Sequence, residues 1–282
     1  METKTKKRAG KKSRGISAFI VIVAAFILAE SLFYFVFGQS GHFQGIKDGD
    51  PSFVWLIEGG EKLHPDNLLG TVFRGGFVVP IIITLMFTVI ILSVERIFAL
   101  SKAKGRGNLI NFVYDVKAEL KKGNIAAAEA LCAKQKGSVA AIVDAGLKKY
   151  KEMETMDMPK EQKIEEIKAE IEEATALELP SMQQNLPIIA TISTLGTLMG
   201  LFGTVLGMIK SFAALGNAGA VDSVALSVGI SEALVNTATG IATGALAIIT
   251  YSYFSGKIDN MTYAIDEMGF ALTQTYAETH NS

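Results

Sequence analysis

Long runs of apolar residues alternate with polar stretches along the chain. Each of four runs is about 20 residues or longer, the length that a helix needs to cross the ~30 Å hydrocarbon layer of a bilayer. The runs cover residues 16–38, 76–99, 187–214 and 229–254. The third and fourth are rich in Gly, Thr, Ser and Ala, which also suit buried helices of soluble proteins, but their length favours the membrane. We therefore predict four transmembrane helices.

The first run follows a strongly basic arm, residues 1–15, which holds seven Lys or Arg residues and one acid. A secretory signal peptide also begins with a basic region, but its apolar core covers only about 7–15 residues. The run here is longer and ends in the aromatic sequence SLFYFVFG, which is typical of a retained anchor. A basic arm can also bind nucleic acid or anionic lipid; beside a membrane span we interpret it as a topology determinant.

Charge asymmetry orients the segments between the runs, because cytoplasmic loops carry an excess of Lys and Arg. Segment 39–75 has three basic residues against five acids, segment 215–228 has no Lys or Arg, and four basic residues crowd the end of the second run between Arg96 and Arg106. Both termini are therefore expected in the cytoplasm. The predicted organisation is a basic cytoplasmic N-terminus 1–15, transmembrane helices 16–38, 76–99, 187–214 and 229–254, periplasmic loops 39–75 and 215–228, a cytoplasmic helical region 100–186 and a cytoplasmic tail 255–282.

The region 100–186 is the one sizeable polar part of the sequence. Its Ala-rich pattern indicates helices, with breaks at Gly123 and Gly137. A charged helix follows, and its apolar positions share one face that we expect to pack on neighbouring helices or subunits. These positions are Ile164, Ile167, Ile171 and Ala174. Pro180 and Pro187 are expected to bend or interrupt the passage into the third run.

Composition narrows the class further. Hydrophobic residues make up 49% of the 282 residues and charged residues 20%, and only six are proline, which favours long helices. The 27 Lys and Arg nearly cancel the 28 Asp and Glu, so net charge gives no argument for a nucleic-acid partner. One cysteine, Cys132, excludes an internal disulfide, and three scattered histidines provide no metal cluster. We find no phosphate loop and no nucleophile motif, so we expect an all-α membrane protein with no cofactor, no metal and no enzymatic activity.

Small residues recur every fourth position in the last two runs. Such spacing lets the backbones of neighbouring membrane helices approach closely. We therefore expect these two helices inside a tight bundle, with the bulkier first and second runs facing lipid. The packing residues are Gly196, Gly200, Gly203 and Gly207 in the third run, and Gly240 and Gly244 in the fourth.

One polar stripe follows the fourth run. Glu232 lies about one turn inside it, where an ionised carboxylate is expensive and marks a candidate functional site. At about 100° per residue, four further polar residues fall within about 40° of Glu232. They are Asn236, Thr239, Thr243 and Thr250, and the third run carries Thr194, Thr197 and Thr204. Each hydroxyl alone can simply satisfy a backbone carbonyl, but an aligned row with a carboxylate predicts a hydrated or protonatable path.

Three other charges lie in or beside the runs. Glu30 can be a second protonatable group, can pair with a neighbouring helix or can reach the interface. Lys210 is expected to extend to the outer headgroups, and Arg96 to mark the inner boundary and contact phosphate groups.

Three stretches of the sequence carry a family resemblance. They are LPIIATISTLGTLMGLFGTVLGMIKSF, GISEALVNTATGIATGALAIITYSYFSGKI and, more loosely, GNIAAAEALCAKQKGSVAAIVDAGL together with ER at 95–96. GLFGTVLGM followed by ISEAL at this separation is far more specific than a lone glycine motif. With these residues the chain resembles the MotA/TolQ/ExbB proton channel family, on its TolQ/ExbB side, over about residues 76–258.

The resemblance implies an energy-transducing complex of the bacterial inner membrane. Members of the family form a homo-oligomeric ring, pentameric in the TolQ/ExbB branch, around the helices of an ExbD/TolR-like single-span partner with an essential Asp. The proton motive force then acts on a TonB- or TolA-like protein that spans the periplasm. By motif position, Thr204, Glu232 and Thr237 correspond to polar residues that line the family's proton path.

The sequence also departs from the family. Thr194 stands where many relatives have proline, GIATGALAII lacks the usual proline, and the first run and segment 39–75 lie outside the three-span family core. Thr237 lies about 140° from Glu232 around the helix, so it cannot share the stripe. Thr237 could still line a proton path between subunits if it faces the third run of a neighbouring subunit.

A proton-driven motor subunit that energises transport across the outer membrane, as ExbB does, is the leading hypothesis. TolQ-like envelope maintenance or motility is the alternative output, because the partner protein decides it. A passive channel or solute transporter is a second class, although transporters commonly show internal repeats and none is evident. The third class is a purely structural scaffold protein, in which Glu232 is a buried carboxylate that contributes only to packing.

Overall fold

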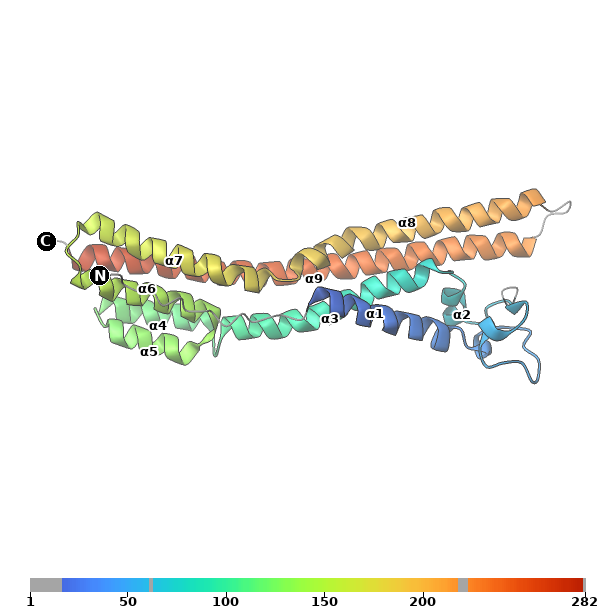
Figure 1. Ribbon diagram of the computed structural model, residues 1–282, viewed down its shortest axis with the longest axis horizontal. Coiled ribbons are helices and arrows are strands. Elements are labelled where there is room, and N and C mark those ends of the chain that lie inside the picture. The colour runs from blue at the N-terminus through green and yellow to red at the C-terminus, as the bar shows by residue number, and fades with distance from the viewer. Residues whose placement is uncertain (1–16, 61–62, 218–222, 281–282) are drawn as a thin grey trace, which may run out of the picture. The chain divides into compact units, whose positions relative to one another are not determined.

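The computed structural model describes residues 17–60, 63–217 and 223–280 (Figure 1). The predicted basic N-terminus 1–15 and the middle of the predicted loop 215–228 lie outside the described residues. The described chain is helical, without a β-strand, and two isolated β-bridges join Gln39 to Phe53 and Phe43 to Pro65. The long helices are α1 (Ala18–Leu32), α3 (Val78–Lys104), α4 (Leu109–Lys121), α5 (Ile125–Gln135), α6 (Gly137–Thr155), α7 (Lys160–Gln183), α8 (Leu186–Asn217) and α9 (Ser223–Thr279). Short elements are the π-helical turn η1 (Phe33–Phe37), the 3₁₀ turns η2 (Ser40–His42) and η3 (Val54–Leu56), and α2 (Leu68–Phe73).

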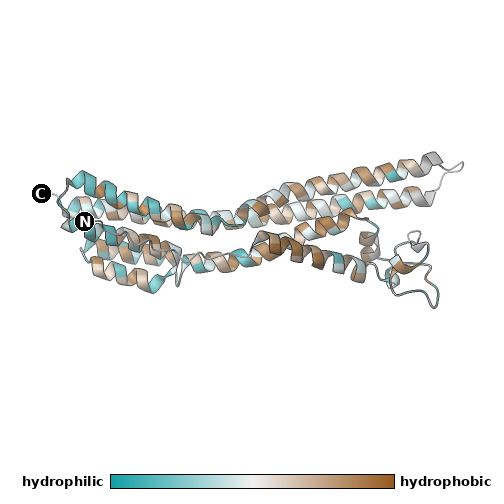
Figure 2. Cartoon of the chain, in the orientation of Figure 1, coloured by the Kyte–Doolittle hydropathy of each residue, from teal (hydrophilic) through white to brown (hydrophobic). Residues whose placement is uncertain are grey.

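Four helical segments are long and apolar enough to cross a membrane, as the sequence predicts. They contain α1 with η1, α3, α8 and the first part of α9. Figure 2 shows the apolar residues concentrated along α1 and the first part of α3, and hydrophilic residues along α6 and α7. The chain is therefore an all-helical, multi-pass membrane protein.

The chain divides into two compact units. The first, which we call the span unit, contains the described residues of 18–98 and 185–260. The second, which we call the helical unit, contains Ser17 and the described residues of 99–184 and 261–280. Helices α3 and α9 contribute residues to both units.

In the span unit, α1 packs on α3 through a narrow stripe. Its buried residues recur every fourth position, at Val21, Ala25, Ala29 and Phe33, and they meet buried residues of α3 such as Val79 and Val89. The other sides of α1 expose large apolar side chains, among them Phe19 and Ile27. A single α-helical stripe that packs on protein, with the rest apolar and exposed, is typical of a helix that faces lipid on most of its surface.

The burial of the four spans differs from the sequence-based expectation. The α3 segment is the most buried, with 50% of its apolar window inside the protein, against 28% for α8 and 33% for α9. The prediction that the second run faces lipid is therefore wrong within this chain, because half of its apolar window is buried. In the first run only 22% of the apolar window is buried, so most of that run is exposed as predicted. The reason is packing: the small residues of α8 and α9 meet each other, so their bulky side chains, such as Leu201 and Leu234, point away.

Between the first two spans, the described residues 38–60 and 63–74 form a small folded structure that we call the α1–α3 connection. Its aromatic residues stack on the end of α1: the Phe33 and Phe73 rings lie 4.7 Å apart, and Phe53 stacks on Trp55 at 5.9 Å. Asn67 caps α2 by accepting hydrogen bonds from the backbone amides of Leu69 and Gly70. The Arg74 guanidinium donates to the carbonyl oxygens of Gly60 and Leu63.

The helical unit is built around large buried side chains. Leu147, Tyr150 and Ile167 of α6 and α7 are buried. At the end of α9 the Tyr276 ring lies 4.8 Å from the Tyr150 ring, and its hydroxyl donates a 3.1 Å hydrogen bond to the carbonyl of Met153. The predicted apolar face of α7 is confirmed, because Ile167 and Ile171 are buried. The predicted breaks are confirmed as well: Gly123 and Gly137 both have positive φ and separate α4, α5 and α6.

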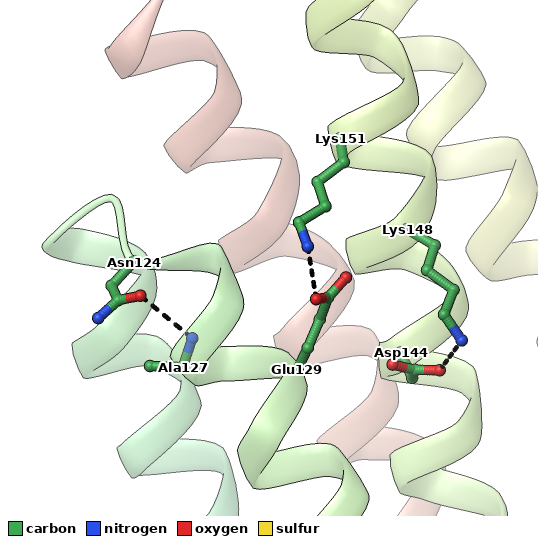
Figure 3. Close-up of polar contacts among 6 residues, drawn as sticks. All are labelled: Asn124, Ala127, Glu129, Asp144, Lys148 and Lys151. Atoms are coloured by element: carbon green, nitrogen blue, oxygen red, sulfur yellow. Dashed lines mark hydrogen bonds and ion pairs between the residues drawn. The ribbon is translucent and has the colours of Figure 1, made fainter.

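Figure 3 shows charged and polar contacts on α5 and α6 of this unit. Lys151 of α6 pairs with Glu129 of α5, Lys148 pairs with Asp144 one turn earlier, and the Asn124 side chain accepts a 3.1 Å hydrogen bond from the Ala127 amide at the start of α5. Such contacts join neighbouring turns and helices at the rim of an apolar core.

Two boundaries were not evident from the sequence. The predicted tail 255–282 continues α9 as far as Thr279, and its residues from 261 onward pack in the helical unit. The passage into the third span breaks at Asn185, whose φ is +66°, while Pro180 lies inside α7 and Pro187 lies in the first turn of α8. A proline at that place costs no helical hydrogen bond, because the first amides of a helix have no partner.

Candidate functional site

Glu232 lies on α9 within the span unit, and it is 5% exposed. Its Oε1 atom lies 2.6 Å from Lys210 Nζ of α8. The Glu232 carboxylate is buried, whereas the Lys210 side chain is 54% exposed. The ion pair therefore links a buried acid to a residue at the surface of the span unit. A buried carboxylate needs such a partner, because an unpaired charge in a low-dielectric interior is expensive.

The turn that enters α3 forms another wall of this site. Gly76 has a φ of +75°, and a Cβ built on it would lie 2.5 Å from Glu232 Oε1. The preceding residue, Gly75, accepts a 2.9 Å hydrogen bond from Asn236 Nδ2. Only glycine satisfies both the backbone conformation and the close approach at position 76. The sequence analysis missed this turn, although the Gly-Gly pair directly before an apolar run was a visible signal.

Asn236 lies one turn from Glu232 and is fully buried. Its Nδ2 donates to two carbonyls, Gly75 and Glu232, but its Oδ1 has no hydrogen-bond donor within the described chain. Buried polar atoms normally have a partner, so an acceptor without one is a place for water or another hydrogen-bond donor. One turn beyond the Glu232 carboxylate, the polar stripe therefore has a hydrogen-bond acceptor, Asn236 Oδ1, that water or another donor can use.

The rest of the predicted stripe continues along the same side of α9. Thr243 is buried, with its Cγ2 atom 3.1 Å from a Cβ built on Gly196, and Thr239 is half-buried. Both hydroxyls donate to carbonyls of their own helix, Thr239 to Val235 and Thr243 to Thr239, at 2.9 Å each. These two hydroxyls thus make the local contacts that threonines usually make in a membrane helix.

Thr204 and Thr237 form a second polar contact, on another side of α9. Their hydroxyls hydrogen-bond to each other, and each also lies 3.3 Å from the carbonyl of Ala233. The angular argument that separated Thr237 from the stripe agrees with this arrangement. Within this chain the hydrogen-bond partner of Thr237 is Thr204, and a path between subunits that includes Thr237 stays a prediction.

The glycines of α8 and α9 bring the two backbones into direct contact, as shown by the adjacent ribbons in Figure 1. A Cβ built on Gly240 would lie 2.6 Å from the Cα of Gly200, and one on Gly207 would lie 2.7 Å from the carbonyl oxygen of Gly229. Similar close approaches occur at Gly196, Gly203 and Gly244. Small residues thus hold α8 close enough to α9 for Lys210 and Thr204 to reach their partners.

Two charged residues lie differently from the sequence-based expectation. Lys210, expected at the headgroups, directs its ammonium group to Glu232. Arg96, expected to contact phosphates, is 1% exposed and pairs with Glu95, whose Oε2 lies 3.3 Å from Asn185 Nδ2. In both cases a carboxylate lies within reach, and a hydrogen bond between two charged groups is stronger than one between neutral groups. Glu30 is half-buried on α1.

The chemistry available here is proton exchange at a carboxylate. The described residues contain no group of three or more His, Cys, Asp or Glu side chains that could hold a metal ion. Glu232 can accept a proton, Lys210 can compensate its charge, and Asn236 offers a hydrogen-bond acceptor next to it.

Comparison with known proteins agrees with this geometry. Residues 128–267 match the model of the MotA/TolQ/ExbB proton channel family, a range that contains most of α5, all of α6 and α7, and the site residues of α8 and α9. The matched range begins at 128, so α3, Glu95–Arg96 and the Gly75–Gly76 turn lie before it, although the sequence resemblance had been extended from residue 76.

Individual relatives carry ExbB and TolQ names. An ExbB-like biopolymer transport protein of Synechocystis sp. is 30% identical over 118 residues, which are 41% of this chain and 56% of the relative. The Tol-Pal system protein TolQ of Pseudomonas aeruginosa is 34% identical over 84 residues, 30% of this chain and 36% of that protein. Biopolymer transport protein ExbB of Salmonella typhimurium is 34% identical over 70 residues, 25% of this chain and 29% of that protein.

The chain thus spans between about a third and a little over half of the length of the relatives it matches. The range matched by the family model includes the helices that carry Thr204, Glu232 and the glycine contacts. Family match, relatives and helical membrane architecture agree, and on these grounds the chain belongs to the MotA/TolQ/ExbB proton channel family.

Proposed function

We propose that the chain is the proton-conducting subunit of a bacterial inner-membrane motor that couples the proton motive force to transport across the outer membrane, as an ExbB protein would. The observation that carries the proposal is the Glu232 site: a buried carboxylate with a lysine partner, next to a buried amide whose Oδ1 lacks a donor. A purely structural carboxylate would be expected to sit in a fully satisfied network. The site performs no covalent chemistry, so the protein acts as a transducer and not as an enzyme.

The proposed assembly is a homo-oligomeric ring around an ExbD/TolR-like single-span protein, acting on a TonB/TolA-like protein. Support comes from the family and from the chain's exposed apolar α8 and α9 surfaces, which include Leu198, Leu201 and Leu234. The proposed orientation places both termini and the helical unit in the cytoplasm, because Lys and Arg concentrate beside the ends of the spans on that side. A TolQ-like role in envelope maintenance is the alternative output, since relatives of both names match.

The first experiment compares Glu232→Gln with the native complex, purified from its own membranes and reconstituted in liposomes that contain a pH-sensitive dye. We expect Glu232→Gln to reduce proton flux to the level of protein-free liposomes, because glutamine keeps the shape and cannot exchange a proton. Glu30→Gln is the matched control, since it removes the carboxylate of the first span and is expected to retain most of the flux. Unchanged flux in Glu232→Gln would overturn the proton-path assignment.

Native mass spectrometry of the same preparation tests the partners. A closed ring that holds a single-span protein supports the motor, and the identity of a third, periplasm-spanning protein separates import from envelope maintenance. A ring or monomer that retains no second protein in mild detergents would contradict the motor assignment. The remaining hypothesis would then be a channel that acts without a partner protein.

A further inference from the structure

The α1–α3 connection carries an exposed apolar patch that the proposed proton path does not use. The patch consists of Tyr34 and Phe35 of η1 together with Trp55 and Leu56 of η3, and we call it the Trp55 patch. The four side chains are between 41% and 55% exposed. Four large apolar side chains exposed together are unusual on a surface that faces only water.

The position of the patch along α1 suggests what covers it. The first candidate span covers 20 residues, Ala18–Phe37. At about 1.5 Å per residue a helix of this length extends about 30 Å, the thickness of the hydrocarbon layer. Tyr34 and Phe35 therefore lie in the last turn before the boundary between hydrocarbon and headgroups, the level at which Trp and Tyr are enriched in membrane proteins.

Specific contacts fold the connection back onto this level. Trp55 Nε1 donates a 3.3 Å hydrogen bond to the Tyr34 carbonyl, and the Val54 amide donates a 2.8 Å hydrogen bond to the Gly38 carbonyl. The Trp55 ring also meets the Tyr34 ring edge-to-face at 6.0 Å. The single polar group of the indole is thus satisfied within the protein, and the exposed remainder of the ring is apolar.

The patch continues the lipid-facing side of α1. Phe26 and Ile27, on the preceding turns of the same helix, are 47% and 60% exposed. Glu58 follows η3 two positions after Leu56 and is exposed. A carboxylate so close to the patch suits the headgroup region and not the hydrocarbon interior.

We infer that the Trp55 patch docks on the phospholipid interface, so that the α1–α3 connection is a folded lipid anchor lying at the headgroup level beside the end of α1. The inference concerns a surface outside the residues matched by the family model and does not depend on proton conduction. Its area is small, so it anchors this segment locally and adds to the attachment already given by the spans.

Trp55 makes a direct test possible, because it is the chain's single tryptophan. The full-length protein is placed in nanodiscs of phosphatidylcholine brominated at carbons 6 and 7 or at carbons 11 and 12, and iodide is added as an aqueous quencher. We expect the shallow bromines to quench Trp55 fluorescence at least twofold more strongly than the deep ones, and iodide to quench it several-fold less than free tryptophan. Strong iodide quenching without a bromolipid effect would show that the patch faces water and would overturn the inference. Protection from both quenchers would overturn it too, because a second copy or another protein would then cover the patch.

A pair of substitutions checks the same point without changing the fluorophore. Leu56→Asp places a charge in the patch and is expected to reduce quenching by the shallow bromines by half or more, because the segment then lifts from the interface. Leu177→Asp is the matched control, since Leu177 is a 73% exposed leucine of α7 in the helical unit, and it should leave the quenching unchanged. Equal quenching in native protein and Leu56→Asp would contradict a lipid contact at Leu56.

Discussion

Helix α9 packs in two different ways along its length. In the span unit it meets α8 through glycine, with Gly240 against the backbone of Gly200. In the helical unit the same helix inserts large side chains, Leu272 and Tyr276, which are fully buried against α6. One continuous helix thus satisfies two packing rules.

The difference reflects the solvent around each unit. In water, burying large apolar side chains is itself the driving force, so a core of Leu, Ile and Tyr is favourable. In lipid the surroundings are as apolar as leucine, and helices associate through close backbone contact between small residues. The comparison teaches that an apolar residue stabilises the span unit mainly when it is small and the helical unit mainly when it is large.

The largest effect should come from truncating a leucine in each unit. Leu147→Ala removes a fully buried side chain of α6 and should cost the helical unit about 3 kcal/mol of unfolding free energy, because a cavity remains. Leu28→Ala shortens an outward-facing side chain of α1, which is 53% exposed, and should cost only a few tenths of that. Thermal unfolding followed by circular dichroism in the same detergent measures both, and equal losses would remove the distinction between the two units.

Adding one methyl group tests the opposite rule. Gly240→Ala places a Cβ 2.6 Å from Gly200 Cα and should destabilise the α8–α9 pair by about 2 kcal/mol through overpacking. At Gly256 of the same helix a Cβ meets nothing within 4 Å, so Gly256→Ala should leave stability unchanged or raise it by up to about 1 kcal/mol. The comparison uses the midpoint of unfolding in detergent, and a tolerated Gly240→Ala would mean that the backbones are not in contact.

The ion pairs of Lys210 and Lys151 should contribute differently to stability. Lys210→Met leaves the buried Glu232 side chain without its cation, and because Lys210 itself is half exposed we expect a loss of about 1 kcal/mol of unfolding free energy. Lys151→Met is the control, because its partner Glu129 reaches water and the loss should be smaller. The midpoint of unfolding in detergent measures both variants, and equal losses would contradict the prediction.

The smallest effect at neutral pH concerns Cys132 in the helical unit. Burial, followed by the nearby charges of Asp144 and Glu129, raises the pKa of the Cys132 thiol from 9.0 to about 12. The folded unit holds this proton more tightly than the unfolded chain, so its stability is complete below pH 9 and declines as pH rises towards 12. Alkylation of this single cysteine should be slow at pH 8 in the native protein and fast in denaturant. Rapid native alkylation would show that the thiol is accessible.

The sequence predicted the spans and the packing glycines because both depend on local properties. Run length defines a span, and a four-residue spacing defines a packing face such as Gly196–Gly200. It likewise placed Glu232 and Asn236 on one side of α9, because helical periodicity alone gives that angle. The proton-path role of these residues stays a prediction.

The remaining features depend on residues far apart in the chain. The ion pair between Lys210 and Glu232, and the hydrogen bond from Asn236 to Gly75, join segments that periodicity cannot bring together. The burial of α3 was not predicted for the same reason, because Val89 and Leu92 pack in one cluster with Ile189 of α8 and Ala247 of α9, which lie far along the chain. Thr237 combines a local and a long-range property. Its angle around α9 was predictable from the sequence, whereas its hydrogen-bond partner Thr204 of α8 was not.

Gly76 has a mechanical consequence. Arg74, two residues before it, donates hydrogen bonds to the carbonyls of Gly60 and Leu63, and a Cβ built on Gly76 would lie 2.5 Å from Glu232 Oε1. Only two residues thus separate an anchored arginine of the α1–α3 connection from the backbone that lines the buried carboxylate. A displacement of the connection at Arg74 would therefore shift one wall of the Glu232 site.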